Sequence, residues 1–207
     1  MHTLLEPWTI GALPLRNRLW MAPVKTAFGT PEGRITDRHL HFYRRVAEGG
    51  IGLLIIEPVP VLWEGREHPK QLAVTRPESP EDLAAIAAVI HQGGARAGLH
   101  LNHAGRAANP NAGGDPAGPT ASPCPARGTE ARELQVSEID AIIDAFGRAA
   151  RVGAGAGFDV IEIQGGHGYL LQQFLDPKTN QRHDDFGTDR LLFARRVIET
   201  VRGACSL

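Results

Sequence analysis

The sequence predicts an α/β fold in which parallel strands alternate with crossover helices. Short apolar runs rich in branched side chains recur along the chain, as expected of buried strands. Each run is followed by a stretch with helix start and stop signals, and this strand–helix order occurs four times. Parallel strands joined by helices are the simplest arrangement for such an order. Before the first unit, residues 4–15 carry prolines and a glycine among apolar residues and are expected to form a small hairpin.

Length and composition indicate one soluble domain covering residues 1–207. With 207 residues and 42% hydrophobic content the chain can bury one sizeable core. A formal net charge of −1 gives no basic surface for nucleic acid, and no apolar run approaches the roughly 20 residues of a membrane span. Cys124 and Cys205 lie in different contexts, which argues against a disulfide framework and favours a reducing, cytoplasmic compartment.

The strands are expected in four short runs: 18–22, 51–56, 97–101 and 158–161. The second run is apolar throughout, which is typical of a strand covered on both faces. The helices are expected at 36–48, 79–92, 137–152 and 189–202. Ser79 and Ser137 stand where a capping hydroxyl is favoured, and glycines follow the first three helices as stop signals.

Two glycine-rich segments need separate interpretation. Residues 102–136, crowded with Gly, Pro and Ala, are too long for an ordinary connection, and loops of this length are usually functional or disordered. We therefore expect a lid-like loop there. The run 153–157 mimics a phosphate-binding loop, but it precedes a strand instead of following one, so a helix-to-strand turn is the better interpretation.

Three hydrogen-bonding side chains leave the end of the fourth strand: Gln164, His167 and Tyr169. The glycines between them release the chain into a turn that most residues could not follow. In an α/β barrel the carboxyl ends of the strands are where chemistry is done. A carboxamide, an imidazole and a phenol at that place suit the polarisation of a carbonyl group and the delivery of a proton.

Each of these residues also has a purely structural interpretation. His167 could be an ordinary loop histidine, Tyr169 a packed ring bonded to the backbone, and Gln164 an amide that completes a turn. His100 and His103 suggest a metal, but their odd spacing on a strand sends them to opposite faces, so no metal site is expected. Within the fourth strand, Glu162 is expected to be a structural acid paired with an arginine.

A longer pattern resembles one known family. The run IEIQGGHGYLLQQFLDP at 161–177 continues with Asn180, Arg182, Asp184 and Gly187. It is similar to the fourth-strand signature of the Old Yellow Enzyme family, FMN-dependent NADH:flavin oxidoreductases that reduce activated C=C bonds. The runs RNRLWMAPV, GLLIIE and HLNHAGR resemble the first three strands of that family, so the resemblance covers essentially the whole chain.

The resemblance implies a (β/α) barrel of the TIM type, of which this chain holds the first four units as a half barrel with an N-terminal hairpin. It implies FMN as cofactor, NAD(P)H as reductant and a small enone or enoyl compound as substrate. Gln164 and His167 would hold the substrate carbonyl, and Tyr169 would protonate the α-carbon. The flavin contacts implied are Ala22, Pro23, Val24, Lys25, Pro58 and His100.

The chain also departs from the family pattern. Lys25 stands where the family often has Thr or Cys, and could instead be a solvated surface cation. Pro58 lacks an N–H, His100 replaces the usual Gln, and Gln164 replaces a carbonyl-binding His. The family's flavin-phosphate loops and a flavin-contacting Arg belong to the other half of the barrel.

A half barrel leaves its first and fourth strands as open edges, with helix faces partly uncovered. We therefore predict association with a partner chain or with itself to complete the barrel; an unstable fragment is the third possibility. Two other functions stay open. The chain could be a non-catalytic half-barrel subunit or remnant without flavin, or a different barrel enzyme such as a metal-dependent hydrolase or aldolase.

Overall fold

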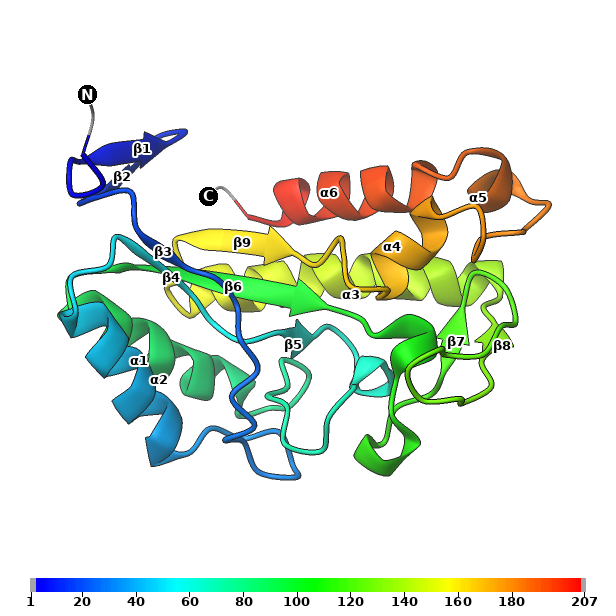
Figure 1. Ribbon diagram of the computed structural model, residues 1–207, viewed down its shortest axis with the longest axis horizontal. Helices are drawn as coiled ribbons and strands as arrows, with labels where there is room; N and C mark the ends of the chain where they lie inside the picture. The colour runs from blue at the N-terminus through cyan, green and yellow to red at the C-terminus, as the bar shows by residue number, and fades with distance from the viewer. Residues whose placement is uncertain (1–2, 206–207) are drawn as a thin grey trace.

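Parallel strands form the centre of the molecule in the computed structural model, which describes residues 3–205 (Figure 1). They pair in the order β3-β4-β6-β9, and β5 joins β6 beyond the end of β4. Their bounds are β3 (Trp20–Met21), β4 (Leu53–Ile55), β5 (Val59–Pro60), β6 (Arg96–Asn102) and β9 (Val160–Ile163). The four predicted strands and their parallel arrangement are confirmed.

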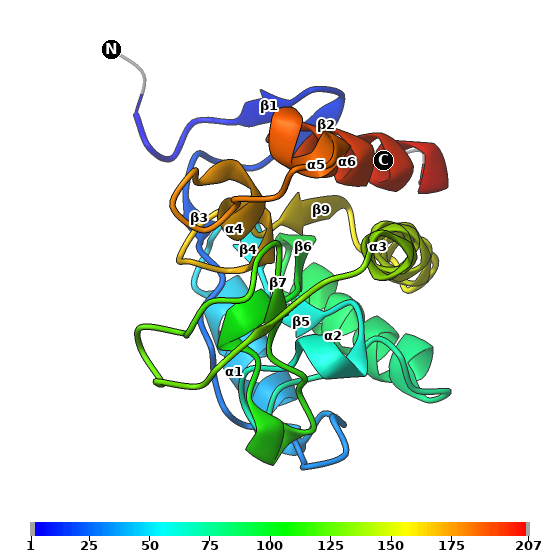
Figure 2. The same cartoon turned by 90° about the vertical axis from the view of Figure 1, so that its right-hand side faces the viewer.

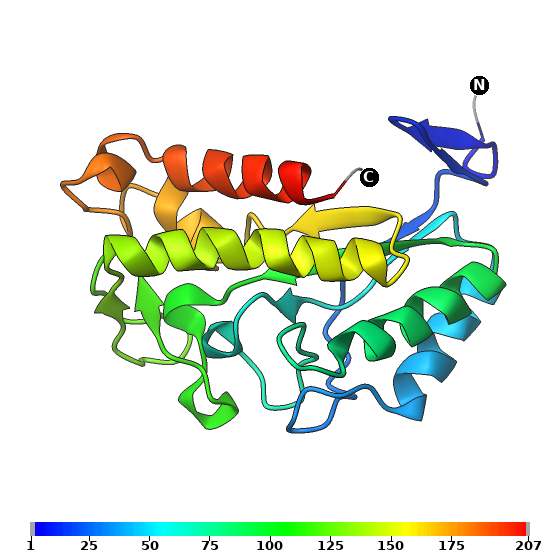
Figure 3. The same cartoon turned by 180° about the vertical axis from the view of Figure 1, so that it is seen from behind.

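Helices cover the outer face of this sheet. They are α1 (Asp37–Glu48), α2 (Ser79–Gln92), α3 (Val136–Gly155) and α6 (Leu192–Ala204). Figure 3 shows α3 and α6 side by side along the sheet, and α1 packs against α2. The predicted α/β fold class is confirmed as part of a (β/α) barrel, with an open sheet and no closed barrel among the residues described.

Successive side chains of β6 point alternately to the core and to the inner face of the sheet. Ala97, Leu99 and Leu101 are buried in the large core beneath the helices. His100 and Asn102, at the alternate positions, face the inner side of the curved sheet. The sheet therefore presents its polar strand ends on the concave side.

Short elements complete the two ends of the molecule. At the start of the strands, β1 (Trp8–Ile10) and β2 (Leu13–Leu15) form the predicted antiparallel hairpin. It packs on a second small core with Leu53 and Ile55. At the carboxyl ends of the strands, which face the viewer in Figure 2, lie the remaining elements. These are η1 (Trp63–Gly65), η2 (Gly105–Ala107), η3 (Pro110–Ala112), β7 (Ala117–Gly118), β8 (Arg132–Glu133), α4 (Leu170–Leu175) and α5 (Asp185–Thr188).

Both predicted serine caps are wrong. The Ser79 hydroxyl donates to the Ala73 carbonyl at 2.7 Å, which turns it back toward the preceding segment. The helix α2 therefore begins with Ser79 itself, after Glu78. Helix α3 begins earlier than predicted, because the Gln135 N–H donates to the Glu138 carboxylate at 2.7 Å in a capping box.

The family-like residues after α4 tie this end of the molecule together. The amide nitrogen of Asn180 donates to the carbonyls of Phe174 and Phe186, each at 2.8 Å. The Arg182 side chain is only 5% exposed and donates to the Pro119 and Leu134 carbonyls at 2.9 and 2.7 Å. The long loop and the segment after β9 are therefore joined, and the loop is ordered by η2, η3, β7 and β8.

The sheet has two edges without a strand partner in the part of the chain that is described. Both β3 and β9 pair on one side only. Trp20 is 50% exposed on β3, and Ile198 is 45% exposed on α6. Between the hairpin, the start of β9 and the end of α6 lies an open groove of about 590 Å³.

Within residues 3–205, no helix combines the length and apolar character needed to cross a bilayer.

Replacing Gly187 by alanine should destabilise this scaffold. An added Cβ would lie 1.9 Å from the Arg182 carbonyl oxygen, so the backbone must move. We expect a loss of roughly 1–3 kcal/mol in the free energy of unfolding, measured by urea denaturation. The matched control is Gly203→Ala in α6, where no atom lies within 4 Å of the added Cβ. It should be neutral or stabilising by up to about 1 kcal/mol. Equal stabilities of the two variants would contradict the packing argument.

Candidate active site

The pairing of β6 with β9 brings a row of hydrogen-bonded polar side chains to the carboxyl ends of these strands. His100 lies opposite Glu162 in the parallel register, and its Nδ1 is 2.5 Å from Glu162 Oε1. Its Nε2 is 2.8 Å from the Oε1 atom of Gln164. The predicted partner of Glu162 is therefore wrong: an imidazole and not an arginine holds this carboxylate, because the register brings His100 beside it.

This chain of contacts orients the Gln164 amide. Since the carbonyl oxygen of Gln164 faces His100, its NH₂ group is turned toward the loop, 3.4 Å from His167 Nδ1. The backbone N–H of Gln164 also donates to the Leu101 carbonyl at 2.9 Å, which continues the ladder beyond β9. A neutral donor is thus presented at the strand end.

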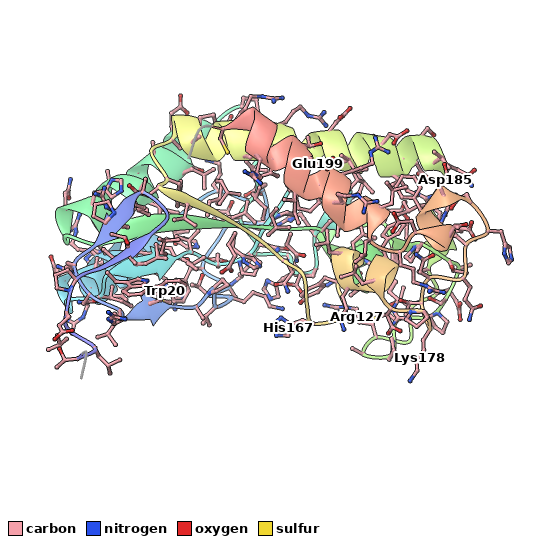
Figure 4. The ribbon with its side chains drawn as sticks, turned by 90° about the horizontal axis from the view of Figure 1, so that it is seen from above. Trp20, Arg127, His167, Lys178, Asp185 and Glu199 are labelled. Carbon is pink, nitrogen blue, oxygen red and sulfur yellow. The ribbon has the colours of Figure 1, made fainter. Side chains whose placement is uncertain are left out.

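His167 lies at the outer end of the loop that follows β9 (Figure 4). Its φ of 60° is in the left-handed region, which few residues other than glycine adopt. Such backbone costs of order 1–3 kcal/mol and often marks a functional loop. The imidazole is exposed to solvent above the strand end.

Tyr169 stands at the N-terminus of α4 and its hydroxyl donates to the Glu67 carboxylate, in the segment after η1. The Nζ atom of Lys25 lies 3.0 Å from the same Glu67 oxygen. Burial, and then the bond to this carboxylate, raise the pKa of Tyr169 well above its ordinary value. The phenol is therefore held firmly in its protonated form.

Sequence reasoning missed Glu67 and Asn102. Glu67 is 102 residues from Tyr169, and nothing in its local sequence distinguishes it from a surface acid. Asn102 ends β6 on the same face as His100, and both polar atoms of its buried amide lack a hydrogen-bond partner in the structure. A polar residue closing an apolar strand was the one available signal for Asn102.

The residues predicted to contact flavin are spread along the concave side and differ in how available they are. Ala22, Val24 and Lys25 are exposed after β3, with Val24 56% exposed, and Pro23 is partly buried. Pro58 is buried and its carbonyl accepts from Gln71 at 2.9 Å. Both ring nitrogens of His100 already have partners. Their cofactor roles stay predictions.

Comparison with known proteins establishes the family. A partial (β/α) barrel with polar side chains at the carboxyl ends of its strands is the class that the fold and site define. The chain belongs to the NADH:flavin oxidoreductase / NADH oxidase family, whose family model matches residues 3–206. The predicted resemblance to the Old Yellow Enzyme family is confirmed.

Two curated relatives show how much of such proteins this chain represents. It is 36% identical to the NADH oxidase of Thermoanaerobacter brockii, covering 97% of this chain and 32% of the relative. It is 34% identical to the NADPH dehydrogenase of Geobacillus sp. (strain WCH70), covering 98% of this chain and 60% of the relative. The chain thus spans between about a third and three fifths of these relatives.

Solved structures give the same picture. A 2-naphthoyl-CoA reductase in complex with 2-naphthoyl-CoA superposes with a TM-score of 0.94 and 27% identity, over 97% of this chain and 33% of that one. An Old Yellow Enzyme homologue from Zymomonas mobilis superposes with a TM-score of 0.90 and 29% identity, over 98% of this chain and 60% of that one.

His103, just beyond β6, is buried and neutral. Its Nδ1 accepts the Gly105 N–H at 3.1 Å, and burial lowers its pKa to about 4. The ring borders a cavity of about 280 Å³ between the long loop and α3. Protonating this ring would place a charge in the interior that the attraction of Asp115 only partly offsets.

His103 should therefore make the fold sensitive to acid. A folded pKa of about 4, below the ordinary 6.5, means that its stabilising contribution is complete above pH 6.5 and is lost as the pH falls toward 4. In His103→Asn, the decrease in unfolding free energy between pH 6.5 and 4 should be smaller by about 3 kcal/mol. Urea denaturation at each pH measures this. The exposed His183→Asn is the control and should keep the wild-type slope; an identical slope in His103→Asn would contradict the burial argument.

Proposed function

We propose that this chain forms the substrate-facing part of an FMN-dependent reductase that uses NAD(P)H to reduce the C=C bond of α,β-unsaturated carbonyl compounds. The observation that carries the proposal is the joint placement of an oriented amide, Gln164, and a protonated phenol, Tyr169, on one loop at the strand ends. Membership of the family supports it.

The residues on the concave side of the sheet, near the carboxyl ends of the strands, are chemically suited to bind a flavin. The buried amide of Asn102 has unused donors and an unused acceptor, which a polar ring edge could satisfy. Ala22, Pro23 and Val24 offer an apolar surface after β3, and Lys25 a cation beside it. Pro58 could contribute only its ring, and His100 would hydrogen-bond only by exchanging a present partner.

Bound FMN would supply the hydride that it obtains from NAD(P)H. Side chains of this protein would polarise the substrate carbonyl and deliver the proton. The NH₂ group of Gln164, with His167, donates to the carbonyl oxygen of the substrate and so draws electron density from the alkene. Tyr169 then gives its phenol proton to the α-carbon. The pKa of this phenol lies well above the ordinary value of about 10, so it gives its proton only to the strongly basic carbon that develops in this reaction.

The proposed site also needs the part of the barrel that lies outside this sequence. The open edges of β3 and β9 and the groove beside α6 are the surfaces that further barrel strands would cover. Those strands could belong to a partner chain or to a second copy of this one. The native mass of the purified protein, from light scattering, distinguishes an assembly from a monomer.

FMN binding is the first expected outcome. The purified chain, or its assembly, should show flavin absorbance, or acquire it with a raised midpoint of thermal unfolding when FMN is added. Asn102→Leu removes the unpartnered amide and should weaken FMN binding at least about tenfold. A protein that stays colourless and gains no stability with added FMN would support the alternative of a half barrel without flavin.

Tyr169→Phe should separate the two halves of the reaction. Reduction of flavin by NAD(P)H should keep its wild-type rate, because the phenol takes no part in it. Reoxidation by an enone such as 2-cyclohexenone should slow by about 10²–10⁴-fold, the usual contribution of a positioned acid. Stopped-flow absorbance follows both steps in the same sample, so the first step serves as the control. Equal rates of reoxidation in wild type and variant would remove Tyr169 from the proposed role.

A further inference from the structure

A buried carboxylate beside Tyr169 is not accounted for by the proposed reaction. The Glu67 side chain is only 4% exposed, and one of its oxygens accepts the phenol while also facing Lys25 Nζ at 3.0 Å. The other oxygen is buried without a hydrogen-bond partner in the structure. Burying a carboxylate costs free energy unless a charged or hydrogen-bonding partner compensates for the lost hydration. Here one of its two oxygens has no such partner.

The backbone around Glu67 is fixed independently of its carboxylate. Its N–H donates to Gln71 Oε1 at 3.0 Å. Its carbonyl accepts from Arg127 Nη2 at 2.8 Å and from Asn109 Nδ2 at 3.3 Å. The backbone from which the carboxylate extends is therefore held by the scaffold, and the carboxylate itself contacts the Tyr169 phenol and the Lys25 ammonium group.

Within the cluster formed by Lys25, Glu67 and Tyr169, Lys25 is the residue in contact with solvent. The Lys25 side chain is 44% exposed, whereas Tyr169 is partly buried and Glu67 is nearly enclosed. Arg127 and Cys124, both from the long loop, are the other titratable groups that act on Tyr169. Arg127 bonds the backbone of Glu67, so Lys25 is the cation that pairs with the carboxylate among the residues described.

We propose that Glu67 and Lys25 form a relay that returns a proton from solvent to Tyr169 after each turnover, with Glu67 as the positioning residue. This inference rests on the proposed function. At rest the phenol O–H points at Glu67, so rotation about its C–O bond directs the proton to the substrate. The tyrosine O–H bond breaks as the C–H bond at the α-carbon forms, and a phenolate remains.

The return of the proton is balanced. An N–H bond of Lys25 breaks as a carboxylate oxygen of Glu67 gains the proton, and that O–H bond breaks as the phenol O–H forms again. The neutral amine of Lys25 then takes one proton from water. Two anions in contact repel each other, so the phenolate beside Glu67 is strongly basic and its reprotonation is favoured.

The first test needs no flavin. The chain contains two tyrosines, Tyr43 and Tyr169, so tyrosinate absorbance or the ¹⁹F signal of incorporated 3-fluorotyrosine can be assigned with Tyr169→Phe. Glu67→Gln should lower the titration midpoint of Tyr169 by about one pH unit or more, because the neighbouring charge is lost. Glu64→Gln, the same change on the exposed side chain in η1, is the matched control and should leave it unchanged.

Lys25→Met provides a second variant on an exposed side chain if Glu67→Gln folds poorly. At neutral pH it should shift the ¹⁹F signal of Tyr169, because the Glu67 carboxylate that accepts the phenol O–H loses its cation. An unchanged Tyr169 midpoint in Glu67→Gln together with an unchanged ¹⁹F signal in Lys25→Met would overturn the proposal.

The second test uses the FMN-loaded protein and compares one turnover with many. The ratio of the steady-state rate to the single-turnover rate should fall at least about tenfold in Glu67→Gln and Lys25→Met, and stay at the wild-type value in Glu64→Gln. Added methylamine should partly restore Lys25→Met. A chain that binds no FMN overturns the relay together with the proposed function. Normal FMN reduction with a wild-type ratio in both variants overturns the relay alone.

Discussion

The parallel pairing of β6 with β9 is the constraint on which the site depends. Its register sets His100 opposite Glu162, and its continuation sets the Gln164 N–H on the Leu101 carbonyl. Because side chains alternate along a strand, a slip of β9 by one residue would turn Glu162 and Gln164 away from His100 and into the core beneath the helices. The orientation of the Gln164 amide, and with it the donor offered to a ligand, follows from this register.

Two buried carboxylates hold the segment that follows β3, which has no strand partner of its own there. The partly buried Thr26 donates to Glu57 at 2.5 Å, and Glu57 also contacts His39 and Tyr43, which are both fully buried. One residue earlier, Lys25 pairs with Glu67. The two acids differ in their charged partners: Glu57 faces the fully buried His39, whereas Glu67 faces Lys25, which is 44% exposed. This difference is why a structural role suits Glu57 and a proton-transfer role suits Glu67.

The open edges of the sheet agree with the partial coverage of the related structures. The chain superposes closely on larger proteins of its family while covering 33% and 60% of two of them. The edges of β3 and β9 are the two places where a barrel sheet would continue. In a closed barrel, further strands beyond β3 and β9 would complete the side of the site that these strands leave open.

Local sequence was sufficient for the elements and for part of the site. The strands, the four long helices and the N-terminal hairpin follow from apolar runs, glycine stops and proline positions, which act within a few residues. The serine caps failed because the Ser79 hydroxyl bonds the Ala73 carbonyl in the turn before the helix, a competition that residue type does not reveal. Gln164, His167 and Tyr169 could be grouped from sequence because one glycine-rich loop carries all three.

Tertiary structure alone decided the partners of these residues. Glu67 lies 102 residues before Tyr169, and Glu162 meets His100 across 62 residues, so no local pattern could join them. The sequence by itself determined which chemical groups stand at the strand ends, because strand order and loop composition are local properties. Only the folded sheet and its loops decided which group donates to which, because hydrogen bonds depend on positions that distant segments take when they pack together.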